Sequence, residues 1–252
     1  MQQSRYFPSP FSAAPPAPER APWGIQDIFK AIGILIIAAV VLIVPAAIIA
    51  AAIAGSSDAV DDDPDALAVL LGANALIEVC LLFVAYRFSV RKYRISWRAL
   101  GFRWPFRGGF WLPIFVLIAS YITLAVYAGI LYAVGADDLL PESTLPDTAF
   151  DSPAVTIITA ILAVALAPVM EETFFRGFVF GSLKDRWGII LAALASGVLF
   201  ALVHFDPGSM IPFTIIGMIF AFSYVYSGSL FVPIAAHFIF NTVSTIATIA
   251  GA

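Results

Sequence analysis

Seven long apolar runs occupy most of this chain of 252 residues, and charged loops separate all of them except the last two. A transmembrane helix needs roughly 20 predominantly apolar residues, because each residue advances the helix by about 1.5 Å. The runs are residues 31–57, 66–86, 109–134, 154–182, 188–205, 210–226 and 231–250. The run 210–226 is the short one and could be tilted or partly re-entrant. The sequence therefore predicts an all-α fold, a polytopic membrane helix bundle of about seven transmembrane helices.

Composition supports lipid as the surroundings of this chain. Hydrophobic residues make up 61% of the sequence and charged residues 12%, whereas a soluble domain is roughly half apolar and about a quarter charged. No basic patch is interleaved with aromatic residues as a nucleic-acid site would require. We therefore expect an integral, multi-pass membrane protein whose partners are membrane lipid and a membrane-associated protein or peptide. Nothing in the sequence indicates the oligomeric state.

The chain divides into a tail and a membrane domain. Residues 1–24 are rich in Pro and Ala, which predicts a disordered tail. Residues 25–252 form the predicted transmembrane helical domain. The first apolar run is longer than the roughly 7–15 residues of a signal-peptide core, so we expect a retained helix. Residues 52–54 do resemble a cleavage site, which leaves removal of this segment as the alternative.

Charge placement predicts the orientation of the bundle. The segment 87–107 carries only basic charges, on the same side as the N-terminal tail. Because basic loops stay in the cytoplasm, we expect the N-terminus inside and, with seven spans, the C-terminus outside. The loops of the opposite side carry the acids Asp58, Asp61, Asp62, Asp63, Asp65, Asp137, Asp138, Glu142, Asp147, Asp151 and Asp206.

Ionisable side chains within the spans each need a reason, because lipid makes them costly unless they are paired or face water. Glu172 and Arg176 are four residues apart, so they lie on one helix face and can form an ion pair with a supporting role. Glu171 points about 100° away and has no local counter-charge, which suits a general base or acid. The alternative is that all three residues simply hold helices together.

Both histidines of the protein also lie in apolar runs. His204 alone could be an interfacial residue bonded to a loop. His237 and Asn241 are four residues apart on the last span, and two polar groups one turn apart indicate a site. Together with Glu171, these side chains form a hydrolytic set in which one group deprotonates water and others hold an oxyanion.

Three motifs now stand in order in three of the last four spans. They are Glu-Glu-x-x-x-Arg at 171–176, Phe-x-x-x-His at 200–204 and His-x-x-x-Asn at 237–241. Over residues 154–245 the chain resembles the CAAX prenyl protease and bacteriocin-processing family, also called CPBP or Abi. Each motif alone is weak, but the ordered set is specific.

The resemblance implies an intramembrane endopeptidase that cleaves a membrane-associated protein or peptide, with or without a prenyl group. It implies that Glu171 activates the attacking water, that His204 assists or holds this water, and that His237 and Asn241 stabilise the oxyanion. Two rival functions remain open from the residues. One is a proton-coupled transporter, although no clear repeat relates the two halves. The other is a catalytically silent membrane scaffold or immunity protein.

Metal dependence is left open by the motifs. Family members are often called metalloproteases, and Glu171, His204 and His237 could bind zinc with water as the fourth ligand. The chain lacks the His-Glu-x-x-His spacing of the zincins. We therefore expect no required cofactor as the first choice and a divalent metal such as zinc as the alternative.

Asn74 and Glu78 are four residues apart in the second span, so we expect them to share a face. An interhelical hydrogen bond, for example from Arg176, is the simplest interpretation. Gly217 and Ala221 form a small-x-x-x-small pair, which predicts a close helix contact.

Overall fold

The computed structural model describes residues 20–105, 107–141 and 150–251, and within these ranges it contains helices and turns but no strand. The predicted all-α fold is therefore confirmed. The α-helices are α1 (Ile25–Ala54), α2 (Pro64–Tyr86), α3 (Trp111–Val134), α4 (Pro153–Ala160), α5 (Ala167–Glu172), α6 (Gly181–Trp187), α7 (Ile189–Leu202), α8 (Met210–Ser227) and α9 (Phe231–Gly251). Three wider π-helical segments are η2 (Arg87–Arg91), η6 (Ile161–Leu166) and η7 (Thr173–Phe180). The short 3₁₀ turns are η1 (Ser57–Asp62), η3 (Trp97–Leu100), η4 (Asp137–Leu139) and η8 (Pro207–Ser209).

Six helical stretches in the described chain are long and apolar enough to cross a membrane. One of them runs without interruption from Pro153 to Trp187 and joins α4, η6, α5, η7 and α6. The seventh, α7, has 14 residues, so this helix is the short one and not 210–226 as expected. The apolar run continues past the end of α7 into a turn, where Phe205 has a positive φ of 53°. The chain is an integral, multi-pass membrane protein.

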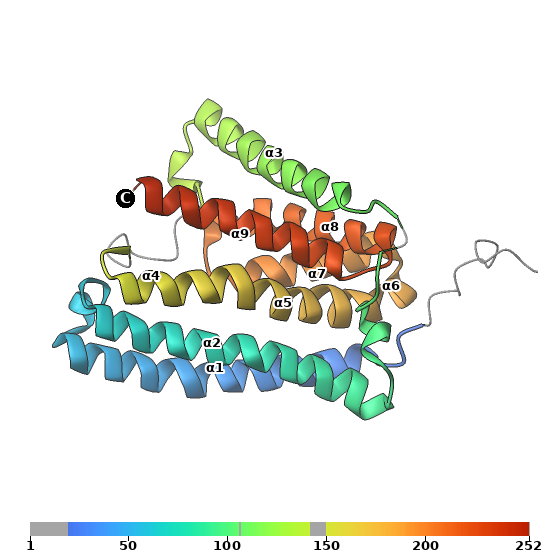
Figure 1. Ribbon diagram of the computed structural model, residues 1–252, viewed down its shortest axis with the longest axis horizontal. Helices are drawn as coiled ribbons and strands as arrows, with labels where there is room; N and C mark the ends of the chain where they lie inside the picture. The colour runs from blue at the N-terminus through green and yellow to red at the C-terminus, as the bar shows by residue number, and fades with distance from the viewer. Residues whose placement is uncertain (1–19, 106, 142–149, 252) are drawn as a thin grey trace, which may run out of the picture.

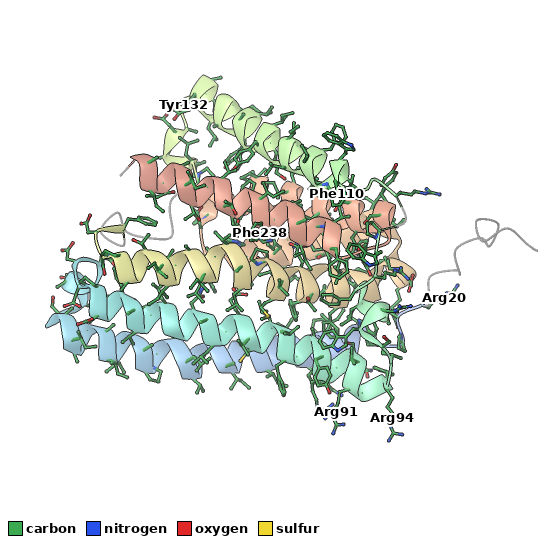
Figure 2. All side chains as sticks on the ribbon, viewed as in Figure 1. Arg20, Arg91, Arg94, Phe110, Tyr132 and Phe238 are labelled. Carbon is green, nitrogen blue, oxygen red and sulfur yellow. The ribbon has the colours of Figure 1, made fainter. Side chains whose placement is uncertain are left out.

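The helices lie roughly side by side (Figure 1). Helices α1 and α2 pack together, α2 packs on α4 and α5, α7 packs on α8, and α3 covers α8 and α9. The two ends of the described chain lie at opposite ends of the helices. Figure 2 shows Arg20, Arg91 and Arg94 at the same end of the bundle, as the charge pattern predicts. Which end faces the cytoplasm stays a prediction, and the loop acids Glu142 and Asp147 lie outside the described residues.

Residues just before α1 are packed against the basic end of the bundle. Trp23 is fully buried, and its indole Nε1 donates a hydrogen bond to the carbonyl oxygen of Phe178 at 2.8 Å. Ser182 Oγ donates to the carbonyl oxygen of Trp23 at 2.9 Å. Tyr93 Oη donates to Asp27 Oδ2 at 2.7 Å near the start of α1. The predicted tail of residues 1–24 otherwise lies outside the described residues, apart from 20–24.

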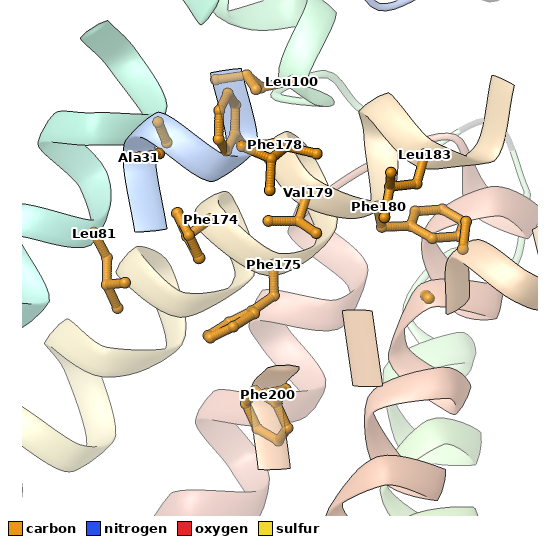
Figure 3. Packing of buried hydrophobic residues seen from close by; sticks show 14 of the residues in the cluster. Ala31, Leu81, Leu100, Phe174, Phe175, Phe178, Val179, Phe180, Leu183 and Phe200 are labelled. Carbon is orange, nitrogen blue, oxygen red and sulfur yellow. The ribbon is translucent and has the colours of Figure 1, made fainter. Parts of the chain in front are cut away.

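The interior of the bundle is centred on η7. All eight residues of η7 are buried, and its aromatic side chains pack against residues of α1, α2 and α7 (Figure 3). Phe174 and Phe175, which follow the two glutamates after Thr173, contact each other edge to face. This packing holds the polar end of α5 within the bundle.

Helices α7 and α8 approach closely through two glycines. A Cβ atom on Gly197 would lie 2.5 Å from the carbonyl oxygen of Thr214, and one on Gly217 would lie 2.7 Å from the Cα of Gly197. The predicted close contact at Gly217 is therefore present, and Ala221 one turn later is also buried. Small residues allow this approach because they add no side chain between the two backbones.

We expect Gly197→Ala to destabilise the protein by about 1–3 kcal/mol, because the added methyl group must push two backbones apart. The matched control is Gly33→Ala in α1, where nothing lies within 4 Å of the position that a Cβ atom would take. That change should leave stability unchanged or raise it slightly, because Ala favours helix over Gly. Thermal unfolding in detergent measures both variants. Equal melting temperatures for the two would contradict the close contact.

Candidate active site

Five of the six polar motif residues come from three elements of the bundle, and His204 follows α7. Glu171 and Glu172 end α5, Arg176 lies in η7, and His237 lies in α9. The glutamates and Arg176 thus flank a change from α-helical to π-helical backbone. Such wider turns are frequent at functional sites, because they turn side chains away from the regular helical direction.

Glu172 and Arg176 form the predicted ion pair. Arg176 Nη1 donates to Glu172 Oε1 at 2.7 Å, and both side chains are completely buried. Arg176 Nη2 also donates to the carbonyl oxygen of Gly217 at 3.3 Å, and the guanidinium lies 4.4 Å from the ring centroid of Phe200. The pair therefore ties α5 and η7 to α7 and α8.

His237 lies between the two neighbouring glutamates. Its Nδ1 is 2.9 Å from Glu172 Oε1. Because an ionised carboxylate only accepts hydrogen bonds, Nδ1 carries a hydrogen and donates it. The other ring nitrogen, Nε2, is 3.9 Å from Glu171 Oε2, which is too long for a direct hydrogen bond. Glu172 thus fixes the ring, and Nε2 faces Glu171.

Glu78 joins this group from α2. The carboxyl groups of Glu78 and Glu171 are both buried and interact with each other. In the described residues, Oε2 of each has no hydrogen-bond partner. The sequence assigned no role to Glu78 and suggested Arg176 as a partner, whereas in the structure its carboxyl group lies near that of Glu171. Asn74 is exposed and does not share this burial. The available signal was a lone acid in the middle of an apolar run.

His204 lies in the turn that follows α7. Its Nδ1 donates to the carbonyl oxygen of Phe200 at 2.8 Å, and its ring packs edge to face against Phe200 and Phe213. Phe200 also contacts the ring of His237, with centroids 5.9 Å apart. The two histidines are therefore linked through Phe200, and no hydrogen bond among the described residues joins His204 to Glu171.

Asn241 lies one turn after His237 on α9. Its Nδ2 donates to the carbonyl oxygen of Ala163 at 2.7 Å, and the side chain is only partly buried. The structure thus brings Glu171, Glu172, Arg176 and His237 into one connected group, with Asn241 one turn further along α9 and His204 in contact with the same Phe200 ring as His237.

The conditional zinc ligands Glu171, His204 and His237 do not assemble into a metal site. Zinc ligand atoms lie about 2.0–2.2 Å from the metal, which places them close to one another. Across the described ranges of the chain, no group of three His, Cys, Asp or Glu side chains has this proximity. The residues present therefore do not fit a zinc ion in this arrangement.

Six long apolar helices and a buried acid–histidine group define a polytopic membrane protein with an intramembrane polar site. Residues 153–243, somewhat over a third of the chain, match the family model "Type II CAAX prenyl endopeptidase Rce1-like". All seven motif residues lie inside the match, whereas Glu78 lies outside it. The family resemblance carried by the three motifs is confirmed.

Two curated bacterial proteins are similar to parts of the chain. The putative membrane peptidase YdiL of Bacillus subtilis is 36% identical over 90 residues, which are 36% of this chain and 35% of the relative. The membrane-embedded CAAX protease MroQ of Staphylococcus aureus is 27% identical over 157 residues, which are 60% of this chain and 57% of the relative. The chain thus matches between about a third and somewhat over half of their lengths. No solved structure matches it significantly.

Proposed function

We propose that this protein is an intramembrane endopeptidase that hydrolyses a peptide bond with a water molecule activated by Glu171. The observation that carries the proposal is the separation of 3.9 Å between Glu171 Oε2 and His237 Nε2. A water molecule can lie about 2.8 Å from both atoms, because that distance suits hydrogen bonds to each. The family match and the two peptidase relatives support the same reaction.

In the proposed reaction, the water oxygen attacks the carbonyl carbon of the scissile bond and its proton passes to Glu171. The tetrahedral intermediate then collapses, the C–N bond breaks, and Glu171 returns the proton to the leaving nitrogen. The products are a new carboxyl group and a new amine, and Glu171 is regenerated as a carboxylate. General acid–base catalysis of this kind contributes about 10²–10⁴ to the rate.

His204, His237 and Asn241 complete the proposed mechanism. His204 donates Nδ1–H to Phe200, so its neutral ring presents Nε2 as an acceptor that can help to hold the water. His237 and Asn241 would donate to the oxyanion of the tetrahedral intermediate. For this step Nε2 of His237 must carry a hydrogen in addition to the Nδ1 hydrogen held by Glu172.

The proposed substrate is a membrane-associated protein or peptide. A site within the bundle is reached most easily by a chain that is already at the membrane, through its own apolar segment or an attached lipid. The name of the matching family and that of the relative MroQ point to CAAX sequences, whose cysteine carries a prenyl group. Both prenylated and unprenylated peptides are therefore the substrates to compare.

The proposed mechanism uses no metal ion, and Glu171 takes the part of the base that activates the water. Cleavage that persists after exhaustive chelation, in protein found free of metal by elemental analysis, would support this. Stoichiometric zinc that is lost together with activity would contradict it.

The test is cleavage of a peptide library, with prenylated and unprenylated members, by the purified full-length protein. New termini are identified by mass spectrometry. We expect the parent to cut and His204→Ala to lose cleavage while it stays folded. The matched control is Ile37→Ala, which changes an exposed apolar side chain of α1 and should cut like the parent. If no member of the library is cut, or if His204→Ala cuts as well as the parent, the proposal fails.

A further inference from the structure

The helix that carries the two glutamates has a gap in its backbone hydrogen bonding. In η6 the amide of Ala167 donates to the carbonyl oxygen of Leu162, five residues earlier. In the same register, the next amide would be that of residue 168, and its acceptor would be the carbonyl oxygen of Ala163. Residue 168 is a proline and has no N–H group. The carbonyl of Ala163 is therefore left without the donor that this register would supply.

A side chain of α9 supplies the missing donor. Asn241 Nδ2 donates to the carbonyl oxygen of Ala163 at 2.7 Å. The segments α9 and η6 pack against each other, so this bond crosses directly between two helices. Within a membrane, a backbone carbonyl has no water to replace a lost partner. The side chain of Asn241 thus replaces the missing backbone donor. The bond satisfies the carbonyl of Ala163 and anchors the Asn241 amide.

This anchor also restricts the direction of the second N–H of Asn241. A side-chain amide has two hydrogens on one planar nitrogen, so a bond to one of them limits where the other can point. Asn241 lies one turn after His237, whose Nε2 faces Glu171. A free amide could rotate away from this group, whereas an amide bound to Ala163 cannot do so without breaking the bond.

We propose that Pro168 is a positioning residue for Asn241: by leaving the Ala163 carbonyl without a backbone donor, it holds the Asn241 amide in the orientation that the oxyanion requires. This inference rests on the proposed function for its catalytic meaning. The pairing of Pro168 with Asn241 through Ala163 is a separate, structural statement that can be tested without any substrate.

The first experiment is a double-mutant cycle on thermal unfolding in detergent with Pro168→Ala, Asn241→Ala and both together. In the parent, Asn241→Ala should lower the melting temperature by roughly 2–4 °C, as expected for one hydrogen bond in a protein of this size. In the Pro168→Ala background, the new backbone N–H can donate to the Ala163 carbonyl or allow a regular helical turn. Asn241→Ala should therefore have almost no effect on the melting temperature of that variant. Equal shifts in both backgrounds would overturn the pairing. If Pro168→Ala does not fold, Pro168→Ser supplies the same N–H.

The second experiment measures peptide cleavage by the same variants. We expect Asn241→Ala to lower kcat on the order of 100-fold, as for loss of an oxyanion donor. Pro168→Ala should lower kcat about tenfold with KM unchanged, because the donor is misdirected and not removed. In the double variant, Pro168→Ala should add no further loss. Pro45→Ala, a helix-interior proline of α1, is the matched control and should keep the parent kcat.

The two experiments separate failure of this inference from failure of the proposed function. A parent kcat in Pro168→Ala, next to a strong loss in Asn241→Ala, would overturn the positioning role and leave the peptidase intact. Coupled melting temperatures in a protein that cuts no peptide would overturn the peptidase and the catalytic meaning of the anchor. The pairing of Pro168 with Asn241 would then stand as a structural feature alone.

Discussion

Glu171→Gln is expected to reduce peptide cleavage by about 10²–10⁴-fold, because an amide cannot accept the proton of the attacking water. The change keeps the size of the side chain, so the packing of the buried end of α5 should be preserved. It also removes one of two buried carboxyl groups that interact, Glu171 and Glu78. The melting temperature should therefore stay the same or rise. Initial rates and thermal unfolding of the purified variant measure both effects.

The neighbouring Glu172→Gln is the control that separates catalysis from structure. Glu172 accepts hydrogen bonds from both Arg176 and His237. The main expected effect of Glu172→Gln is therefore a lower melting temperature. Folded Glu171→Gln protein that cleaves as fast as the parent would rule out Glu171 as the base. A melting temperature that falls more for Glu171→Gln than for Glu172→Gln would contradict the roles assigned to the pair.

Arg176→Met should destabilise the protein by about 3–5 kcal/mol, because it leaves the carboxylate of Glu172 buried without its cation. Both side chains are completely inaccessible, so water cannot replace the lost partner. The hydrogen bond to Gly217 and the contact with Phe200 are lost in the same step. The expected result is a large fall in melting temperature and in the yield of folded protein from membranes.

The double variant Glu172→Gln with Arg176→Met tests the cause of that fall. Removing the charge of Glu172 removes the uncompensated group, so the double variant should recover part of the lost stability. If Arg176→Met cannot be purified, the yields of folded protein from membranes can be compared in place of melting temperatures. A double variant that is no more stable than Arg176→Met would show that lost packing, and not the unpaired charge, dominates.

Six of the seven predicted spans are long enough to cross a membrane, and these could be predicted because lipid imposes a minimum length on each apolar run. Their ends could not be predicted as well. Helix α1 begins at Ile25, before the predicted run, because Asp27 is paired with Lys92, which is far away in sequence. The run 188–205 overestimates α7, because Val203 and Phe205 are apolar residues in a turn. Hydropathy records the environment of a residue and not its backbone conformation.

Some features of the candidate site could also be predicted from the sequence, and others could not. The pair of Glu172 with Arg176 was predictable, because its spacing lies within one helix. The position of His237 between Glu171 and Glu172 depends on how α9 packs against α5, and no local spacing encodes that. The same holds for Glu78, whose helix α2 lies far from the motifs along the chain. The sequence identified the chemical groups, whereas tertiary packing determined which of them meet.

Helix α2 has a consequence for how much of this protein is needed for a working site. Its residues Leu81 and Val84 belong to the same core as Phe174 and Phe178 of η7, and its Glu78 lies beside Glu171. A chain reduced to residues 153–243 would therefore lack α2, which covers one side of the polar group. Glu171 would then face lipid acyl chains. The polar group of this protein is therefore formed by α2 together with the part of the chain that matches the family model.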